Sequence, residues 1–405
     1  MIKIAVLGYG TVGSGVVEVF QTNRESIAGK AGQEIEVKYV PDLREFPGDP
    51  VEKVLVHDFE TILQDPEVAI VVETMGGTHP AYDFSKQALE AGKSVCTSNK
   101  ELVAKHGQEL MTIAKAKGVN YLFEASCGGG IPIIRPLHNA LTADVIDEIT
   151  GILNGTTNYI LSKMTSDGSD FADVLKEAQE KGYAERNPEA DVEGHDACRK
   201  IAILSSIAYG KQVDFEDIYT EGITKITATD IKYAQAIGAR VKLLASSRKS
   251  PEGICAMVSP VLIDASNPLY SVQDVFNAIF VHGNMLGDAM FYGSGAGKLP
   301  TASAVSADVI DCAKNPHTDI MASWTADKQE LVDIGQVRGR FFVRVEGSLE
   351  DKQAQIEKTF GKVEPICLPG VTGEFAFLTE EMTEAAYKEK AEQTAGIISM
   401  IRARF

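Results

Sequence analysis

Three glycines near the start of the sequence constrain the fold more than any other feature. Gly8, Gly10 and Gly13 follow a short apolar run and precede a helical pattern, at the spacing Gly-x-Gly-x-x-Gly. In a βαβ unit the first glycine allows a tight turn, the second lets backbone amides approach a pyrophosphate, and the third permits close packing of strand and helix. The helix N-terminus stabilises the bound anion. The pattern therefore predicts a dinucleotide site that includes Thr11 and Val12.

Short apolar runs alternate with helical patterns through the first third of the chain. We expect parallel strands at residues 2–7, 34–40, 68–73, 94–97 and 120–124. We expect helices at residues 15–21, 79–91 and 102–117. Such alternation predicts an α/β fold with a doubly wound parallel sheet of the Rossmann type.

The rhythm changes after about residue 135, which predicts further domains. Residues 1–135, together with a helix returning at about 298–325, form the expected dinucleotide-binding domain, and residues 136–297 form an α+β substrate domain. Within that domain we expect strands at 146–153, 242–245 and 255–262, and helices at 157–165, 171–181, 196–209 and 231–239. Residues 338–405 follow the order strand, helix, strand, strand, helix, strand, which is typical of a small ferredoxin-like module.

Composition excludes several partners. The net charge of −18 argues against a nucleic-acid backbone or an anionic membrane. The six cysteines include no C-x-x-C pair and are expected to be reduced thiols in the cytoplasm. No apolar run approaches the length that a membrane span needs.

The end of the second strand is where a dinucleotide's ribose is usually recognised. Asp42 is the natural candidate for a ribose hydroxyl, whereas Arg44 would suit a 2′-phosphate. Both residues also fit a solvated turn, so the choice between NAD and NADP stays open at this point.

Charged residues later in the chain indicate a catalytic site. Lys100 follows a parallel strand at the edge where such sheets bind ligands. Asp196 and Lys200 share a helix face beside an apolar stripe, with Glu185 and Asp191 just upstream. Carboxylates near a lysine can hold a substrate amino group and prepare the lysine for proton transfer. From spacing alone, an exposed salt bridge is the competing interpretation.

A glycine-rich segment leaves the fifth expected strand. Residues 124–132 read Glu-Ala-Ser-Cys-Gly-Gly-Gly-Ile-Pro, and their backbone carbonyls could face a cation, with Glu124 supplying charge. A tight interdomain turn explains the glycines equally well. Cys127 has no histidine near it in the sequence, which favours a buried thiol over a nucleophile.

Taken together, these segments resemble homoserine dehydrogenases along nearly the whole chain. The resemblance rests on the glycine loop, Ser98-Asn-Lys100, residues 124–132, residues 154–159, residues 182–200, and Gly295-Ala-Gly297 with Pro300-Thr301. It implies reversible, NAD- or NADP-dependent interconversion of L-homoserine and L-aspartate 4-semialdehyde, run toward homoserine for threonine and methionine synthesis. It also implies a homodimer or homotetramer, with residues 136–297 contributing to dimerisation.

The resemblance further implies a role for each matching residue. Lys200 would exchange a proton with the substrate oxygen, and Lys100 would orient substrate and nicotinamide. Glu185, Asp191 and Asp196 would bind the substrate's amino group or position the lysines. A sodium ion would lie at Glu124 and at the backbone oxygens of Cys127, Gly129 and Ile131. Gly182, Gly295 and Gly297 would border the cofactor.

Two departures from the family pattern concern cofactor choice and regulation. Many relatives have an arginine at the end of the second strand, where this chain has Pro41. The tail resembles an ACT domain, a regulatory module that often binds an amino acid such as threonine. Its first strand–helix loop, residues 346–351, lacks the Asp-x-Pro-Gly pattern of ligand-binding ACT domains, which argues against threonine feedback.

Two other interpretations remain to be compared with the structure. A nucleotide-sensing regulatory protein without catalysis would also combine a dinucleotide-binding domain with an ACT-like tail. An aspartate-semialdehyde dehydrogenase would need a cysteine nucleophile paired with a histidine base, and the sequence offers no convincing pair.

Overall fold

The N-terminal part of the chain is built on a parallel sheet in the computed structural model, which describes residues 1–321 and 323–405. In spatial order its strands are β3 (Leu55–Val56), β2 (Ile35–Pro41), β1 (Ile2–Leu7), β4 (Val68–Glu73), β5 (Ser94–Thr97) and β6 (Tyr121–Leu122). This is the strand order of Rossmann sheets. The inner strands β1 and β4 are apolar and almost fully buried, as expected of parallel strands covered on both faces. The predicted fold class is confirmed.

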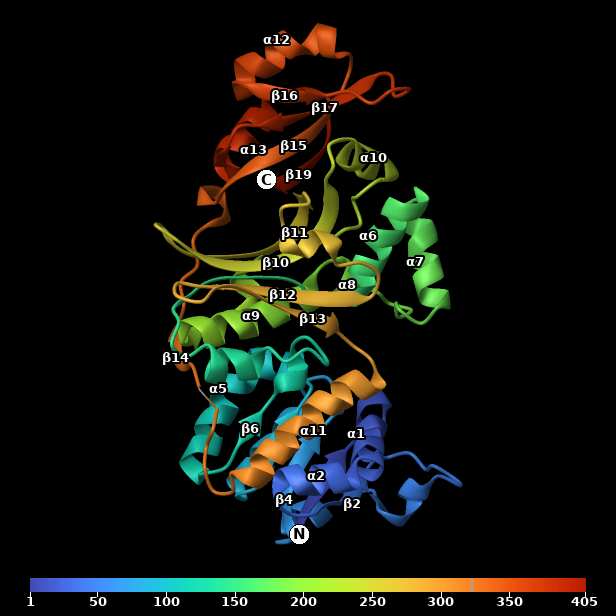
Figure 1. Cartoon of the computed structure of the whole chain (residues 1–405), viewed down its shortest axis with the longest axis vertical. Coiled ribbons are helices and arrows are strands. Elements are labelled where there is room, and N and C mark those ends of the chain that lie inside the picture. Colours follow the sequence, from blue (N-terminus) through green and yellow to red (C-terminus); the bar gives the residue numbers. More distant parts are fainter. Residues whose placement is uncertain (322) are drawn as a thin grey trace.

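Helices cover this sheet on both faces. They are α1 (Thr11–Thr22), α2 (Arg24–Ala31), α3 (Glu60–Gln64), α4 (Ala81–Glu90) and α5 (Lys100–Lys117), joined by α11 (Lys298–Lys314) from much later in the chain. The late helix α11 packs beside α1 (Figure 1).

Several helix starts differ from the sequence prediction, and those of α1 and α5 concern the ligand-binding edge of the sheet. Helix α1 begins at Thr11 rather than near residue 15, so part of the glycine loop lies within the helix. Helix α5 begins at Lys100 rather than at residue 102, because the Asn99 side chain accepts a hydrogen bond from the Leu102 amide at 3.1 Å and caps the helix. Lys100 is therefore the first residue of a helix, and not a loop residue as expected.

The middle of the molecule is a mixed sheet. Its strands run in the order β13 (Gly287–Ser294), β12 (Phe276–Gly283), β7 (Ile146–Ile152), β10 (Arg240–Ser250) and β11 (Gly253–Ile263), with β9 (Tyr219–Thr220) beside β11. The hairpin β10–β11 is longer than the two predicted strands, and the hairpin β12–β13 was not predicted. A separate pair is formed by β8 (Lys211–Gln212) and β14 (Thr325–Lys328).

Helices α6 (Gly155–Asp167), α9 (His195–Tyr209) and α10 (Ala228–Ala236) pack on one face of this sheet, against β10. Helices α7 (Phe171–Glu180) and α8 (Glu189–Val192) lie next to α6 (Figure 1). Single turns complete the chain at Pro50–Lys53, Glu124–Ser126, Pro136–Ala140, Phe215–Asp217, Pro268–Ser271 and Ile334–Gln336. The turn at Glu124–Ser126 ends the fifth predicted strand early, at Leu122.

The C-terminal segment has the predicted order of strands and helices. It consists of β15 (Arg338–Glu346), α12 (Leu349–Phe360), β16 (Val363–Ile366), β17 (Glu374–Thr379), β18 (Met382–Thr383), α13 (Glu384–Glu392) and β19 (Ile397–Arg404). The spatial order β19-β15-β17-β16 is antiparallel throughout. Strand β19 also pairs in parallel with β11, so the module's sheet continues the middle sheet.

Buried ion pairs reinforce this junction. Arg344 of β15 pairs with Asp230 of α10 at 2.9 Å and with Glu374 of β17 at 2.8 Å. Arg402 of β19 pairs with Glu221 at 2.7 Å. Removing one partner of such a buried pair is costly, because the other charge is left uncompensated. These contacts fix the C-terminal module to the middle sheet.

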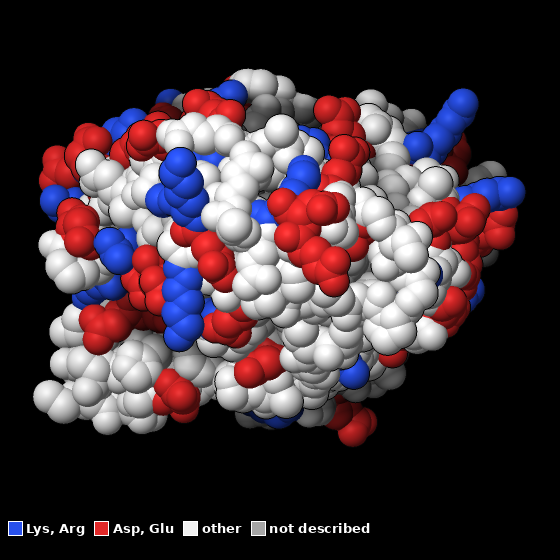
Figure 2. Space-filling model, turned by 90° about the horizontal axis from the view of Figure 1, so that it is seen from above, with Lys and Arg blue, Asp and Glu red and all other residues white. Residues whose placement is uncertain are grey.

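Charges of both signs are interspersed on the end of the molecule that carries the C-terminal module (Figure 2). Within residues 1–321 and 323–405, none of the helices combines the length and apolar character that a membrane crossing would require.

Candidate active site

A cleft of about 530 Å³ opens between the parallel sheet and the middle domain. Its walls include Val12 of α1, Lys100 of α5 and Lys200 of α9. The remaining wall residues come from the loops at 125–129, 154–156, 182–191 and 294–297. The structure thus brings together most of the residues that the sequence singled out. Pockets of this size at domain boundaries commonly bind small molecules.

Two lysines and one aspartate form the centre of the cleft. Asp196 lies on α9 and accepts from Lys200 Nζ at 2.7 Å through Oδ2, and it pairs with Lys100 Nζ at 2.8 Å through Oδ1. The Asp196 side chain is 6% exposed, whereas that of Lys100 is 40% exposed. The pair Asp196–Lys200 is therefore buried, and the alternative of an exposed surface salt bridge is wrong.

The charged forms of Asp196 and Lys100 stabilise each other. Burial opposes ionisation of Asp196, yet the two ammonium groups outweigh it and hold the pKa of Asp196 below its usual range. Burial also favours the neutral form of Lys100, but Asp196 and then Asp191 offset this and raise the pKa of Lys100. Asp196 is therefore an ionised bridge between two ammonium groups.

Asp191 differs from Asp196 in the direction of its pKa shift. Burial, and then the negative charge of Asp196, raise the pKa of Asp191 above its ordinary value. Asn154 Nδ2 donates to Asp191 at 2.7 Å and to Asp196 at 2.9 Å, so one amide holds the two carboxylates next to each other. Glu185 lies at the exposed rim of the same cleft.

Two partners of the lysine–aspartate group were not identified from the sequence. Asn154 accepts from the Thr157 amide at 2.9 Å and caps α6; its position predicts a cap and a polar wall of a site, but not the contacts with Asp191 and Asp196. The Leu153 carbonyl accepts from Lys200 Nζ at 2.7 Å. A backbone acceptor carries no residue-type signal, so the sequence could not reveal it.

The glycine loop has the geometry that pyrophosphate binding needs. Gly8 has a φ of +88°, in the left-handed region that glycine favours. A Cβ atom on Gly13 would lie 1.9 Å from the Gly8 carbonyl oxygen, whereas a Cβ on Gly10 would meet no atom within 4 Å. Strand and helix thus approach closely at Gly13, and open space is left at Gly10, the N-cap of α1.

A second cavity, of about 500 Å³, lies beside this loop at the end of β2. Gly8, Gly10, Asp42 and Arg44 line it. Asp42 accepts from Arg44 Nε at 3.0 Å and from Arg44 Nη2 at 2.8 Å, and it accepts from the Tyr9 amide at 2.7 Å. The Arg44 guanidinium holds the pKa of Asp42 below its usual range. The two candidate ribose residues are therefore paired with each other.

The glycines at the opposite wall allow two loops to meet. A Cβ on Gly129 would lie 2.4 Å from the Gly295 carbonyl oxygen. A Cβ on Gly295 would lie 2.2 Å from the side chain of Asn277. Gly297 has a φ of +120° and caps α11. Gly182, Gly295 and Gly297 all border the cleft.

The Glu124 carboxylate has a different role from the one expected. It accepts from the amides of Ile133 at 2.6 Å, Ile134 at 2.9 Å and Arg135 at 2.7 Å. Both carboxylate oxygens are thus engaged by backbone donors and do not supply a free ligand. That this side chain also supplies charge to a cation site stays a prediction.

Cys127 is not a nucleophile. Its side chain is buried, and burial raises the pKa of Cys127 to about 12. The thiol donates weakly to the Lys200 carbonyl at a sulfur–oxygen distance of 3.7 Å. A protonated, buried thiol cannot perform covalent catalysis, which excludes an aspartate-semialdehyde dehydrogenase mechanism based on this residue.

A Rossmann sheet whose glycine loop faces a cleft with a buried lysine–aspartate group defines a nicotinamide-dependent oxidoreductase. Family models agree with this class: the model of the homoserine dehydrogenase NAD-binding domain matches residues 8–124, and that of homoserine dehydrogenase matches residues 132–310. The chain belongs to the homoserine dehydrogenase family. It is thus an NAD(P)-dependent enzyme that acts on a CH–OH group, and the interpretation as a sensor without catalysis is not supported.

Individual relatives extend the match to the whole chain. Homoserine dehydrogenase from Neisseria gonorrhoeae is 39% identical, over 96% of this chain and 93% of the relative. The crystal structure of a homoserine dehydrogenase from Thiobacillus denitrificans superposes with a TM-score of 0.91 at 37% identity, covering 100% of this chain and 98% of the other. A hyperthermophilic archaeal homoserine dehydrogenase in complex with NADPH is 29% identical, with a TM-score of 0.66 over 77% of this chain and 97% of the other.

Proposed function

We propose that Lys200 exchanges the proton with the substrate oxygen when this enzyme interconverts L-homoserine and L-aspartate 4-semialdehyde. The observation that carries the proposal is the buried contact between Lys200 and Asp196 in the cleft. An ammonium group has three N–H donors. Two of them are used by Asp196 and by the Leu153 carbonyl, so the third is available to a substrate oxygen.

The same group works in both directions of the reaction. A bound nicotinamide ring supplies a hydride acceptor or donor for the carbon that bears the substrate oxygen. In the reductive direction the Lys200 ammonium group donates a proton to the aldehyde oxygen and becomes a neutral amine. In the oxidative direction the neutral amine takes the hydroxyl proton and returns to the ammonium form. Asp196 stabilises the ammonium form and fixes the position of Nζ.

The remaining charged residues of the cleft orient the substrate. Lys100 is half exposed at its entrance, where it can contact the substrate or the nicotinamide. Asp191 and Glu185 offer carboxylates to the substrate's ammonium group, and Asn154 keeps Asp191 beside Asp196. This arrangement selects a short amino acid with a hydroxyl or aldehyde at its far end.

The residues present fit a dinucleotide. The open space at Gly10, together with the amides of Thr11 and Val12 at the start of α1, suits a pyrophosphate. The adjoining cavity suits the adenosine half, with the Asp42 carboxylate at the ribose. Because Arg44 is held by Asp42, and because Asp42 would repel a 2′-phosphate, we expect NAD to be preferred over NADP. The archaeal relative was solved in complex with NADPH. Under our expectation the two proteins therefore differ in cofactor preference.

A monovalent cation fits the backbone of the segment after β6. Cys127, Gly129 and Ile131 are buried, and within the described residues none of their carbonyl oxygens accepts a hydrogen bond. Buried carbonyls without donors are suitable sodium ligands. Glu124 positions this segment through the amide contacts given above and contributes a ligand only through its backbone. Replacing sodium by choline tests this site, and unchanged rates would contradict it.

Self-association is supported by an exposed apolar surface on the hairpin β12–β13. Phe276 and Tyr292 stack at 5.3 Å and are 37% and 54% exposed, and Met290 beside them is 44% exposed. Strand β13 is also the outer strand of the middle sheet. Exposed apolar patches at a sheet edge favour pairing between copies, so a homodimer or homotetramer is expected. Light scattering with Tyr292→Glu tests this surface.

The loop before α12 bears on regulation, and the cysteines bear on location in the cell. The loop before α12 carries Gly347 and the helix cap Ser348, without the Asp-x-Pro-Gly pattern, so we expect threonine to leave the rate unchanged. Free cysteines, with all but Cys367 buried, suit the reducing cytoplasm.

Initial rates decide the proposed function. Purified enzyme is assayed with L-homoserine and either NAD or NADP, with and without threonine. Turnover with a lower KM for NAD, insensitive to threonine, is the expected result. Folded protein without turnover in either cofactor would contradict the assignment.

A further inference from the structure

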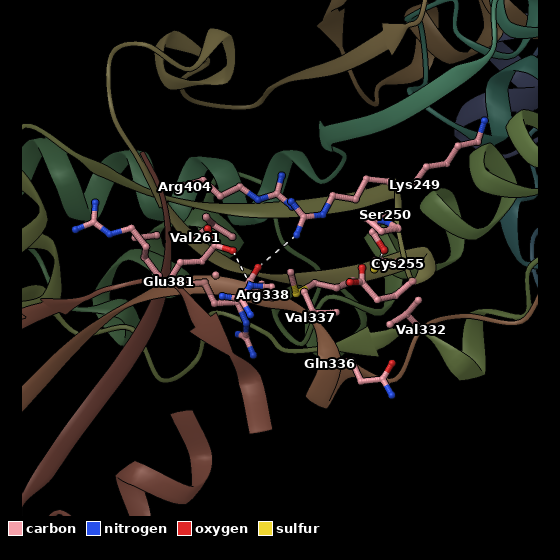
Figure 3. A pocket seen from close by; sticks show the side chains of 18 of the residues that line it. Lys249, Ser250, Cys255, Val261, Val332, Gln336, Val337, Arg338, Glu381 and Arg404 are labelled. Atoms are coloured by element: carbon pink, nitrogen blue, oxygen red, sulfur yellow. Dashed lines mark hydrogen bonds and ion pairs between the residues drawn. The ribbon is translucent and has the colours of Figure 1, made fainter. Parts of the chain in front are cut away.

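A third cavity, of about 530 Å³, lies far from the cleft, where the hairpin β10–β11 meets the C-terminal module. Its walls come from the turn of that hairpin, from the segment at 332–340 and from the end of β19. Arg338, Glu381 and Arg404 project into this space from different elements (Figure 3). None of its residues belongs to the catalytic or dinucleotide-binding site described above.

The cavity gathers positive charge in an acidic protein. Its cationic side chains are Arg248, Lys249, Arg338, Arg340, Arg402 and Arg404. Against these stand two carboxylate side chains on its walls, Glu252 and Glu381, while the whole chain has a net charge of −18. A locally positive pocket on a negative molecule is the electrostatic signature of an anion site.

Most of these cations already have a partner. Arg338 pairs with Glu381 at 2.9 Å, Arg340 with Glu364 at 2.7 Å and Arg402 with Glu384 at 2.5 Å. Lys249 lies 3.7 Å from Asp147. Arg404 pairs with Glu148 at 3.3 Å.

Arg248 differs from the others. Within the described residues it pairs with no carboxylate, and its contact is a long one of 3.4 Å from Nη2 to the Arg338 carbonyl. It also lies close to Arg404: burial first, and then the charge of Arg248, lower the pKa of Arg404. Of these two neighbouring guanidinium groups only that of Arg404 pairs with a carboxylate, Glu148, so an anion would be stabilised at Arg248.

The opposite wall is apolar. Met257, Val337 and Cys255 form a small buried cluster there, with Val332 packed against it. Val261 adds to the same wall. A ligand that only carries charge, such as inorganic phosphate, would leave these side chains without a partner, and a dianion would also meet Glu252 and Glu381.

We propose that this cavity binds a small organic monocarboxylate, with its carboxylate on the Arg248 guanidinium and its apolar part against Met257 and Val337. An arginine fork matches the two oxygens of a carboxylate.

Isothermal titration calorimetry of the full-length chain tests the site with three probes. They are 3-methylbutanoate, its uncharged isostere 3-methylbutanamide, and inorganic phosphate. We expect saturable binding of 3-methylbutanoate, and binding of the amide and of phosphate that is weaker by at least about tenfold, since a charge-assisted contact contributes roughly 1.4 kcal/mol or more. Equal binding of phosphate or of the amide, or no binding of the carboxylate, would overturn the proposal.

Variants locate the bound carboxylate. Arg248→Gln is expected to weaken 3-methylbutanoate binding by about tenfold or more, and Arg248→Lys by less, since it keeps the charge but loses the fork. Arg24→Gln is the matched control: Arg24 is 64% exposed and pairs on the surface with Glu34 at 3.3 Å. Circular dichroism confirms that each variant is folded. Equal affinity of wild type and both Arg248 variants would place the ligand elsewhere and contradict the assignment.

Discussion

Lys100 and Asp196 join the two halves of the cleft through a contact of 2.8 Å. Lys100 begins a helix of the dinucleotide-binding domain, whereas Asp196 lies in the first turn of a helix of the substrate domain. Because Asp196 also holds Lys200, the position of the proposed proton-transfer group depends on both domains. The contacts of Asp196 with both lysines therefore form only when the two domains are in place.

We expect protonation of Asp191 to limit the activity at acid pH. Its pKa is raised by burial and by Asp196, so as pH falls it gains a proton earlier than an ordinary aspartate does and stops attracting the substrate's ammonium group. We therefore expect kcat/KM for homoserine to decrease toward acid pH. In Asp191→Asn this decrease should disappear, and kcat/KM should be lower by about 100-fold at neutral pH. A pH profile measures both effects. Asp173→Asn, on the exposed face of α7, is the control, and an unchanged acid limb in Asp191→Asn would contradict the role.

Asp42 should determine cofactor choice. Removing its carboxylate in Asp42→Ala abolishes the repulsion of a 2′-phosphate and frees Arg44 to contact it. The ratio of kcat/KM for NADP to that for NAD is expected to rise by about tenfold or more, equivalent to roughly 1.4 kcal/mol. Initial rates with both cofactors provide the measurement. If the ratio stays the same, another residue selects the cofactor.

Gly13 tests the close approach of strand and helix. A methyl group there would overlap the Gly8 carbonyl oxygen, which is 1.9 Å from the ideal Cβ position. Gly13→Ala should therefore displace the glycine loop and weaken NAD binding by at least about tenfold, seen by fluorescence titration of NADH. Gly29→Ala is the control, because its Cβ would meet no atom within 4 Å. Normal NADH affinity in Gly13→Ala would show that the loop tolerates the shift.

Lys242 links stability to pH. It is buried on β10, donates to Asn158 Oδ1 at 2.9 Å and to the Val272 carbonyl, and has no carboxylate partner among its hydrogen bonds. Burial, followed by Arg240, lowers the pKa of Lys242 to about 7. Between that value and its ordinary pKa the unfolded chain binds the extra proton, so the contribution of Lys242 to the free energy of unfolding rises with pH.

Lys242→Met removes this dependence. The substitution should cost about 1–3 kcal/mol of unfolding free energy at pH 9, because Asn158 loses its donor. The cost should be smaller at pH 7, where the wild type must bury a partly charged lysine. Urea unfolding at the two pH values measures the difference. A cost that is equal at both pH values, or larger at pH 7, would contradict this account.

The sequence predicted the elements whose pattern is local and strong. The strands at β1 and β4 were found because they are largely apolar runs, and α9 because its apolar stripe is regular. The hairpin β12–β13 was missed, since β13 is an edge strand whose outward side chains include Met290 and Tyr292. An exposed apolar face hides the alternation that identifies a strand.

In the site, residue types were predictable but their contacts were not. The spacing of Asp196 and Lys200 placed them on one helix face, whereas the pairing of Asp196 with Lys100 joins residues distant in the sequence. The Leu153 carbonyl has no sequence signal at all. The amide contacts of Glu124 were not predictable, because a carboxylate that accepts backbone amides looks the same in a sequence as one that binds a cation.

Substitution of Lys200 by methionine tests the central claim most directly. Steady-state rates with homoserine and NAD are measured for Lys200→Met, for the exposed control Lys211→Met and for the wild type, together with the NADH dissociation constant of each. Loss of the proton-transfer group should lower kcat by about 100-fold or more in Lys200→Met, while NADH affinity stays within about twofold of the wild type. A kcat close to that of the wild type in folded Lys200→Met would contradict the assignment of Lys200 as the proton-transfer residue.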